Sequence, residues 1–127
     1  MSKTQHYIPN ENDIILIDLD PASGKEIGKL RPALVMTSKT LNEKTGTCFI
    51  IPISTSIRGG PLEVPVNNIE RKSVACPNLG TTVDFKARHA KKITEAESGV
   101  LEETTLKLMA ILPVTKAMAY AQSNSGN

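Results

Sequence analysis

The sequence predicts a mainly β (α+β) domain: a small, strongly bent β-barrel with one C-terminal helix packed on it. Three observations predict this fold. Short apolar, β-branched runs recur between turn-forming residues, the last third changes to helical spacing, and 127 residues suffice for one core but not for two. Aromatic residues are scarce, so we expect a core of Ile, Leu and Val.

The first two strands enclose a charged loop. Apolar runs over residues 14–19 and 33–36 flank a segment bounded by Pro21 and Gly24, which favours strands over helices. The segment between them carries charges of both signs, on Lys25, Glu26, Lys29 and Arg31. Such a loop is a common place for binding or catalysis, although a plain hairpin with solvated charges is the alternative.

Further strands follow at short intervals. We expect them over residues 47–53 and 62–66, and then two more within residues 73–85 around a turn at Pro77–Gly80. Pro52 and Pro65 each indicate an edge position or a bulge, because proline cannot donate to a β-ladder. Residues 38–46 read as a turn.

The last third predicts a helix. Apolar residues recur at helical spacing from Leu101 to Leu112, Thr94 or Ser98 is the expected cap, and Pro113 ends or kinks the helix. The predicted organisation is therefore an N-terminal arm over residues 1–12, one domain over 13–120 and a disordered tail over 121–127.

Composition excludes some classes of protein. No stretch reaches the length of a membrane span and the N-terminus lacks an apolar leader, so we expect a cytoplasmic protein with no membrane partner. The cysteines, Cys48 and Cys76, are expected to be reduced, and both lie far from the two histidines, His6 and His89. This spacing predicts neither a metal site nor another cofactor.

Polar segments suggest a phosphodiester site. Residues 54–60, STSIRGG, can present hydroxyls and amides to an anion, and positive charge accumulates over residues 71–92. RNA cleavage needs a base, an acid and positive charge against the phosphate oxygens. Arg31 suits the phosphate, Glu26 could act as base, and Ser54 or Thr55 could hold an oxygen. A plain turn and a solvated face are the alternatives.

The pattern D-P-A-S-G-K-E-x4-R-P-A-L-V-M-T-S over residues 20–38, followed by IPISTSIRGGPLEVPV and LGTTVDFKARHAKKI, resembles the MazF/PemK (Kid) family of toxin endoribonucleases. The resemblance covers about residues 12–112. It implies a homodimer of SH3-like barrels of the CcdB/PemK type that cleaves single-stranded mRNA at a short sequence. It also implies no need for metal, 2′,3′-cyclic phosphate and 5′-hydroxyl ends, and a cognate antitoxin with an acidic C-terminal tail.

The resemblance also implies site residues. Arg31 maps to the arginine that acts on the phosphate and the leaving group, and Ser54 to its hydroxyl partner, with Thr55 as the alternative. Lys25 and Asn78 stand where Kid-like members carry histidine and aspartate, so the role of base falls on Glu26. The expected RNA-binding residues are Lys25, Lys29, Arg58, Asn78, Lys86, Arg88 and Lys91.

Two other functions are compatible with the sequence. One is a toxin of the CcdB type, which binds DNA gyrase instead of cutting RNA. The other is an inactive family member that acts only as an antitoxin-bound regulator, and Asn78 is the residue that keeps this alternative open.

Overall fold

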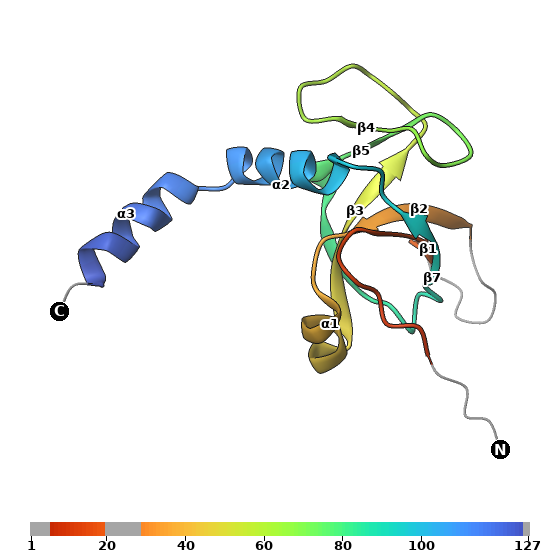
Figure 1. The fold of residues 1–127 in the computed structure, drawn as a ribbon, viewed down its shortest axis with the longest axis horizontal. Coiled ribbons are helices and arrows are strands. Elements are labelled where there is room, and N and C mark those ends of the chain that lie inside the picture. Colours follow the sequence, from red (N-terminus) through yellow and green to blue (C-terminus); the bar gives the residue numbers. More distant parts are fainter. Residues whose placement is uncertain (1–5, 20–28, 126–127) are drawn as a thin grey trace.

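The computed structural model describes residues 6–19 and 29–125 (Figure 1). The strands are β1 (Asp13–Asp18), β2 (Leu30–Val35), β3 (Thr47–Ser54), β4 (Val64–Val66), β5 (Ser73–Ala75), β6 (Thr81–Asp84) and β7 (Lys91–Glu95). The helices are α1 (Lys39–Thr45), α2 (Val100–Ile111) and α3 (Val114–Asn124), with a 3₁₀ turn, η1 (Pro77–Leu79).

Over the described residues the strands form one curled, half-barrel sheet in the order β4-β5-β3-β2-β1-β7, with β6 paired to the other part of β3. All the pairings are antiparallel. The predicted fold class, a mainly β curled sheet with a helix packed on it, is therefore confirmed.

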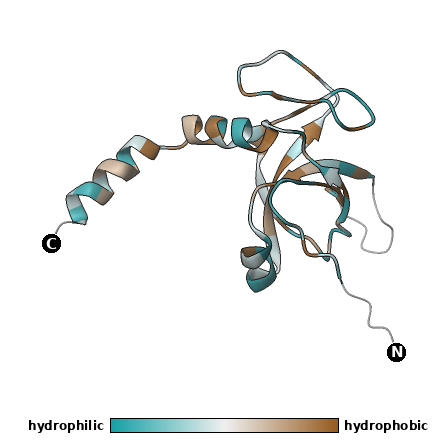
Figure 2. Ribbon diagram, viewed as in Figure 1, coloured by the Kyte–Doolittle hydropathy of each residue, from teal (hydrophilic) through white to brown (hydrophobic). Residues whose placement is uncertain are grey.

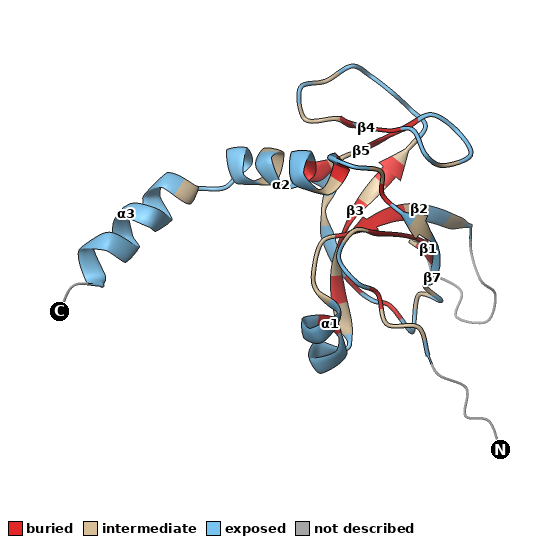
Figure 3. Cartoon of the chain, viewed as in Figure 1, coloured by how far each residue is buried: buried red, intermediate tan, exposed pale blue. Residues whose placement is uncertain are grey.

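Strand alternation divides the core into two clusters. Ile14, Leu34 and Ile51 face one side of the sheet and pack with Val100 of α2, whereas Ile15, Ala33 and Ile50 face the other side. Buried segments accordingly follow the strands and the first turn of α2 in Figure 3, and Figure 2 shows hydrophobic residues at the same places. Packing on both faces of the sheet therefore fixes the positions of the strand ends.

Helix α1 occupies the segment that was expected to be a turn, so that prediction was wrong. The Ser38 side chain accepts a hydrogen bond from Leu41 N at 3.2 Å, and Gly46 ends the helix with φ of 75°. These are ordinary helix caps, but seven residues give too short a periodic signal for the sequence to reveal. Strand β7 was also missed, because its residues are mostly exposed and charged.

The two strand prolines lie in different places. Pro65 is on β4, an edge strand, as predicted. Pro52 is on β3, which has neighbours on both sides, and its pairing with Ala33 has no register shift, so the predicted edge position or bulge was wrong. One side of β3 pairs with β6 up to Ile50 and with β5 from Ile53 onward, and Pro52 falls at the change of partner. There its missing N–H leaves no ladder bond broken.

Helix α2 begins after Gly99, which has φ of 93° and no side-chain cap. The predicted caps, Thr94 and Ser98, were therefore wrong: Thr94 belongs to β7, and the left-handed turn at Gly99 starts the helix one residue after Ser98. The helix buries Val100 and Thr104 against the sheet, and Leu108 packs against the same cluster.

Helix α3 extends away from the sheet (Figures 1 and 3). All of its residues are exposed except the half-buried Val114, with Met118 61% and Tyr120 70% exposed. It continues through residues 121–124, which the sequence assigned to the tail; there Ser123 Oγ donates to Ala119 O at 2.7 Å and Asn124 Nδ2 to Tyr120 O at 2.8 Å. In the described part of the chain, no helix is long and apolar enough to span a bilayer.

Candidate functional site

One end of the sheet brings the ends of three strands together. Strand β1 ends at Asp18, β2 begins at Leu30, and β3 ends at Ser54. Ile17 lies opposite Arg31 in the first pairing, and Ala33 lies opposite Pro52 in the second. The observed pairing of β2 with β3 ends at Ala33 and Pro52; continued by two residues, the same antiparallel register would align Arg31 with Ser54.

Arg31 and Ser54 also share a face of the sheet. Ala33 and Ile50 belong to the same core cluster, and side chains two residues apart on a strand point to the same side. Arg31 is exposed and Ser54 is half-buried. A guanidinium and a hydroxyl therefore lie on neighbouring strands where solvent and a ligand can reach them.

Ser54 also lines a pocket of about 420 Å³ together with Ser56, Arg58, Glu63, Cys76, Asn78 and Leu79. The pocket therefore joins three residues that the sequence predicted, Ser54, Arg58 and Asn78. Thr55, the alternative to Ser54, is exposed and is not among the lining residues. Ser54 Oγ accepts a hydrogen bond from Ser56 N at 3.0 Å, which orients the hydroxyl at the pocket wall.

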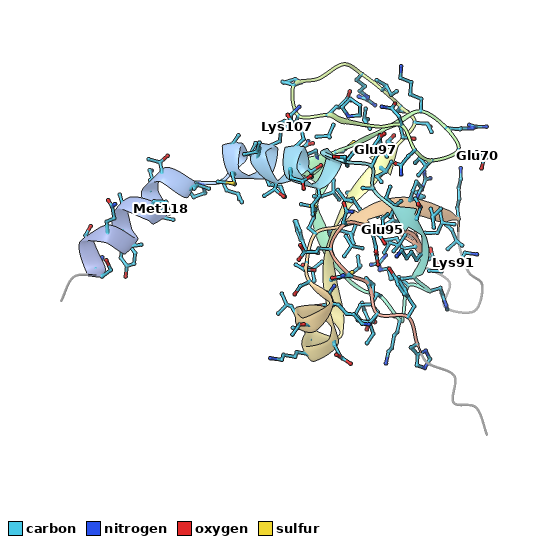
Figure 4. The ribbon with its side chains drawn as sticks, in the orientation of Figure 1. Glu70, Lys91, Glu95, Glu97, Lys107 and Met118 are labelled. Atoms are coloured by element: carbon cyan, nitrogen blue, oxygen red, sulfur yellow. The ribbon has the colours of Figure 1, made fainter. Side chains whose placement is uncertain are left out.

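The carboxylate of Glu63 shapes the loop above this pocket. It accepts hydrogen bonds from Arg58 N at 3.0 Å and from Gly59 N at 2.8 Å. On α2, Lys107 donates from Nζ to Glu63 O at 2.9 Å, and Figure 4 labels this lysine. These hydrogen bonds hold the loop that carries Arg58. Sequence reasoning assigned Glu63 only to a strand and gave it no such role. Its position a few residues after Arg58-Gly59-Gly60 is the signal that could have revealed it.

The far wall of the pocket depends on a close approach. A Cβ atom at Gly80 would lie 2.6 Å from Cζ of Phe49 and 2.8 Å from Cδ1 of Ile51, so only glycine fits. Gly80 directly follows η1, which carries Asn78 and Leu79 into the pocket. Asn78 offers an amide with donors and an acceptor, and Leu79, 59% exposed, offers an apolar surface.

Cys76 is the pocket's thiol, and sequence reasoning gave it no role. Burial raises its pKa, the negative charge of Glu63 raises it further, and Arg58 opposes part of the increase. The thiol therefore stays protonated at neutral pH and acts as a weak hydrogen-bonding group, not as a nucleophile.

The basic residues of the β6–β7 turn and of β7 lie in different parts of the surface. Arg88 donates from Nη1 to Asp18 O at 3.1 Å, and Asp18 N donates to Arg88 O at 2.9 Å, which holds Arg88 beside the end of β1. Lys91 lies opposite Leu16 on β7 and is labelled in Figure 4. Lys86 lines other pockets, on the side of the N-terminal arm.

The remaining predicted residues belong to the segment before β2. Lys29 is exposed immediately before that strand. Lys25 and Glu26 lie outside the described residues, so the proposed base and its neighbour stay predictions. The described residues provide a sheet end with a cation and a hydroxyl, next to a pocket that polar and apolar side chains line together.

The fold places the chain in a class of small proteins built on one curled antiparallel sheet with a helix packed on it. Residues 10–112 match the family model described as PemK-like, MazF-like toxin of type II toxin-antitoxin system. The chain therefore belongs to this family, and the resemblance noted from its sequence is confirmed.

Relatives and solved structures agree with this assignment. The endoribonuclease toxin MazF of Escherichia coli K12 is 37% identical over 86 residues, which cover 68% of this chain and 78% of the relative. The endoribonuclease toxin ChpB of the same strain is 36% identical over 106 residues, covering 79% and 90%. The crystal structure of MazF from Deinococcus radiodurans superimposes with a TM-score of 0.74 at 28% identity, covering 84% of this chain and 97% of that one.

A second crystal structure from Deinococcus radiodurans contains MazE with MazF. It also has a TM-score of 0.74, at 25% identity, and covers 85% of this chain and 98% of that one. The family match ends at residue 112, so α3 lies beyond the region that the family model describes.

Proposed function

We propose that this chain is an endoribonuclease toxin that cleaves single-stranded mRNA at a short sequence, without a metal ion, and that a cognate antitoxin inhibits it. The juxtaposition of Arg31 and Ser54 at one strand end carries the proposal, because it combines a phosphate-binding cation with a hydroxyl on an accessible surface. The names of the relatives, endoribonuclease toxins MazF and ChpB, support the same activity.

The proposed reaction is a transphosphorylation. A base removes the proton of a ribose 2′-hydroxyl, the 2′-oxygen attacks the adjacent phosphorus, and the bond from phosphorus to the 5′-oxygen breaks. The products are a 2′,3′-cyclic phosphate and a 5′-hydroxyl, whose oxygen takes up one proton. Glu26 is the proposed base, and it lies outside the described residues.

Arg31 and Ser54 would act on the phosphate itself. The guanidinium of Arg31 can donate two parallel hydrogen bonds to non-bridging oxygens, where negative charge increases in the transition state. It can also deliver positive charge close to the departing 5′-oxygen. The Ser54 hydroxyl, on the neighbouring strand, would hold a further oxygen and fix the phosphate between the two side chains.

The pocket beside Ser54 is the proposed place for a base of the RNA. Asn78 can hydrogen-bond the edge of a splayed base while Leu79 contacts its face, and Arg58 lines the same pocket. Lys25, Lys29, Arg88 and Lys91 are proposed to contact phosphates, which increases affinity without selecting sequence.

The proposed partners follow from the family and from the surface. A structure of MazE with MazF supports an antitoxin partner, and the cationic strand end suits an acidic C-terminal tail. The exposed apolar residues of α2, among them Leu106 and Met109, support a homodimer that covers them. Both its RNA substrate and its antitoxin would be met in the cytoplasm.

The test is cleavage of a long RNA of known sequence by the purified chain in EDTA. We expect fragments with 5′-hydroxyl ends at a recurring short sequence, and Arg31→Ala should abolish them while Lys116→Ala on α3 changes nothing. Intact RNA under all conditions would instead favour a binding toxin of the CcdB type or an inactive regulator. Cleavage only after addition of a divalent metal would contradict the metal-free reaction.

A further inference from the structure

Three adjacent pockets share His6, and none of their lining residues lines the Ser54 pocket. They lie between the N-terminal arm, α1 and the β6–β7 turn, and have volumes of about 430, 300 and 400 Å³. We define the His6 face by the four basic side chains of the second and third pockets: His6, Lys39, Lys86 and His89.

Two of the four acids that line these pockets, Asp13 and Glu95, are already paired, whereas Glu11 and Glu43 form no ion pair in the described part of the chain. In the first pocket, the carboxylate of Asp13 accepts hydrogen bonds from Tyr7 Oη and Asn10 N, and Lys92 lies 3.4 Å from Asp13 and 3.2 Å from Glu95. Within the described residues, neither Lys39 nor Lys86 forms an ion pair. Glu43 is the acid that lines a pocket of the face itself. The ammonium groups of Lys39 and Lys86 are therefore available to an anionic ligand.

The turn that carries Lys86 and His89 is held in one conformation. Asp84 Oδ1 accepts hydrogen bonds from Lys86 N at 3.1 Å and Ala87 N at 3.0 Å. Lys86 O accepts from His89 N at 3.1 Å, and His89 has φ of 57°. A left-handed residue in so short a turn costs conformational energy, which these hydrogen bonds offset. Both side chains are exposed, so a ligand meets them already positioned.

Lys39 is fixed from a different part of the chain. Its backbone N donates to Asn10 Oδ1 at 2.9 Å, which joins the start of α1 to the N-terminal arm. His6 is exposed and lies next to both lysines in the third pocket. Segments far apart in sequence thus converge to form the cationic face.

The His6 face is continuous with the candidate active site through Arg88. This residue belongs to the same turn as Lys86 and His89, and its guanidinium is bonded to Asp18 O at the end of β1. Strand β1 pairs with β2 next to Arg31. Three strand spacings separate β3 from β7, about 14 Å, so one extended RNA strand can cross the sheet end and reach the turn.

We propose that the His6 face binds the phosphates of single-stranded RNA outside the cleaved sequence, so that long RNAs bind more tightly than short ones. This inference rests on the proposed function. Two ammonium groups suit phosphates, and the two exposed imidazoles can stack on unpaired bases, which an acidic peptide would not use. The face is a docking surface, with no part in the chemical step.

The experiment measures binding of 2′-O-methyl RNA, which cannot be cleaved, by fluorescence anisotropy with the full chain. The ligands are a 20-nucleotide and a 6-nucleotide strand that share the cleaved sequence. The variant Lys39→Glu/Lys86→Glu is compared with Lys44→Glu/Lys116→Glu, which changes the charge equally at positions outside the face. Matched circular dichroism spectra establish that both variants are folded.

We expect the first variant to lose about tenfold or more in affinity for the long strand and less than twofold for the short one. The slope of log affinity against log salt should fall by about 1.4, the value for two lost contacts to a single strand. The control variant should stay within twofold of the wild type. His6→Ala/His89→Ala should also weaken binding of the long strand, because it removes the imidazoles proposed to stack on its bases.

Three outcomes would overturn the proposal: equal losses in the two charge variants, equal wild-type affinity for the two strand lengths, or tighter binding of polyglutamate than of RNA through Lys39 and Lys86. The last would assign the face to an acidic protein partner. Failure of the proposed function is a separate result. If the wild type binds long RNA more tightly but never cleaves unmodified RNA, the RNA-binding role of the His6 face stands and the proposed ribonuclease activity is wrong. If it cleaves RNA but binds both strand lengths equally, the activity stands and the role of the face is wrong.

Discussion

The two ends of β1 use similar polar side chains in opposite ways. At the end near Asp18, which we call the cleavage end, Arg31 and Ser54 reach solvent and can act on a ligand. At the end near Asp13, which we call the clamp end, the polar groups bond to one another: Asn42 is fully buried and Asp13 is 5% exposed. Asn42 and Asp13 at the clamp end therefore stabilise the fold, whereas Arg31 and Ser54 at the cleavage end stay available for chemistry.

The clamp end is organised by Asn42. Its Nδ2 donates to Pro9 O at 2.8 Å and to Thr37 O at 2.9 Å, and its Oδ1 accepts from Thr37 Oγ1 at 2.7 Å. This amide joins α1, the arm and the end of β2 inside the protein. The comparison implies that substitutions at the cleavage end affect activity, whereas those at the clamp end affect stability.

The largest effect is expected for Arg31→Ala. Loss of the guanidinium should reduce the rate of RNA cleavage by about 10² to 10⁴, because the charge in the transition state loses its partner. Since Arg31 is exposed, the unfolding midpoint in urea should stay unchanged. Single-turnover cleavage and urea denaturation measure the two effects. Wild-type cleavage by this variant would remove Arg31 from the catalytic residues.

Asn42→Ala should have the opposite profile. We expect a loss of about 2 to 4 kcal/mol in the free energy of unfolding, because a cavity forms and buried polar groups lose their partners. The cleavage rate per folded molecule should change less than twofold. Urea denaturation followed by circular dichroism measures this stability, since the chain contains no tryptophan whose fluorescence could be followed. Stability within 0.5 kcal/mol of the wild type would contradict the role of the clamp.

Ser54→Ala tests the hydroxyl at the cleavage end. We expect about a 10- to 100-fold loss in rate, smaller than for Arg31→Ala because a neutral donor is removed. Ser54→Thr should retain activity, since it keeps the oxygen, and Thr55→Ala should stay within twofold. If Thr55→Ala is the slower variant, the role of the hydroxyl belongs to Thr55.

The smallest effect concerns pH and a buried thiol on β3. Burial raises the pKa of Cys48 from 9.0 to about 11. The unfolded chain releases this proton near pH 9 and the folded chain does not, so stability present below pH 9 is lost as pH rises toward 11. Between pH 8.5 and pH 10.5, the free energy of unfolding should fall by about 2 kcal/mol more for the wild type than for Cys48→Ala, as measured by urea denaturation. Equal losses would show that the thiol does not contribute.

Much of the fold could be predicted from local patterns. The apolar runs of β1, β2 and β3 and the helical spacing of α2 are properties of short segments, and the structure contains all four elements. Helix α1 and strand β7 could not be predicted, since one is too short and the other too charged to give a periodic signal. Their stability comes from contacts with distant segments, such as the burial of Asn42.

The sequence by itself determined a mainly β chain with Arg31 and Ser54 at strand boundaries, because alternation and turn residues act over a few positions. Only the tertiary structure decided the register of β2 against β3, which, continued past Ala33 and Pro52, aligns these two residues on one face. It also decided that Glu63, Cys76 and Leu79 join Ser54 in one pocket, and that His6 meets Lys39 and Lys86. The physical reason is that strand register and sheet curvature arise from packing across the whole core, which no local segment encodes.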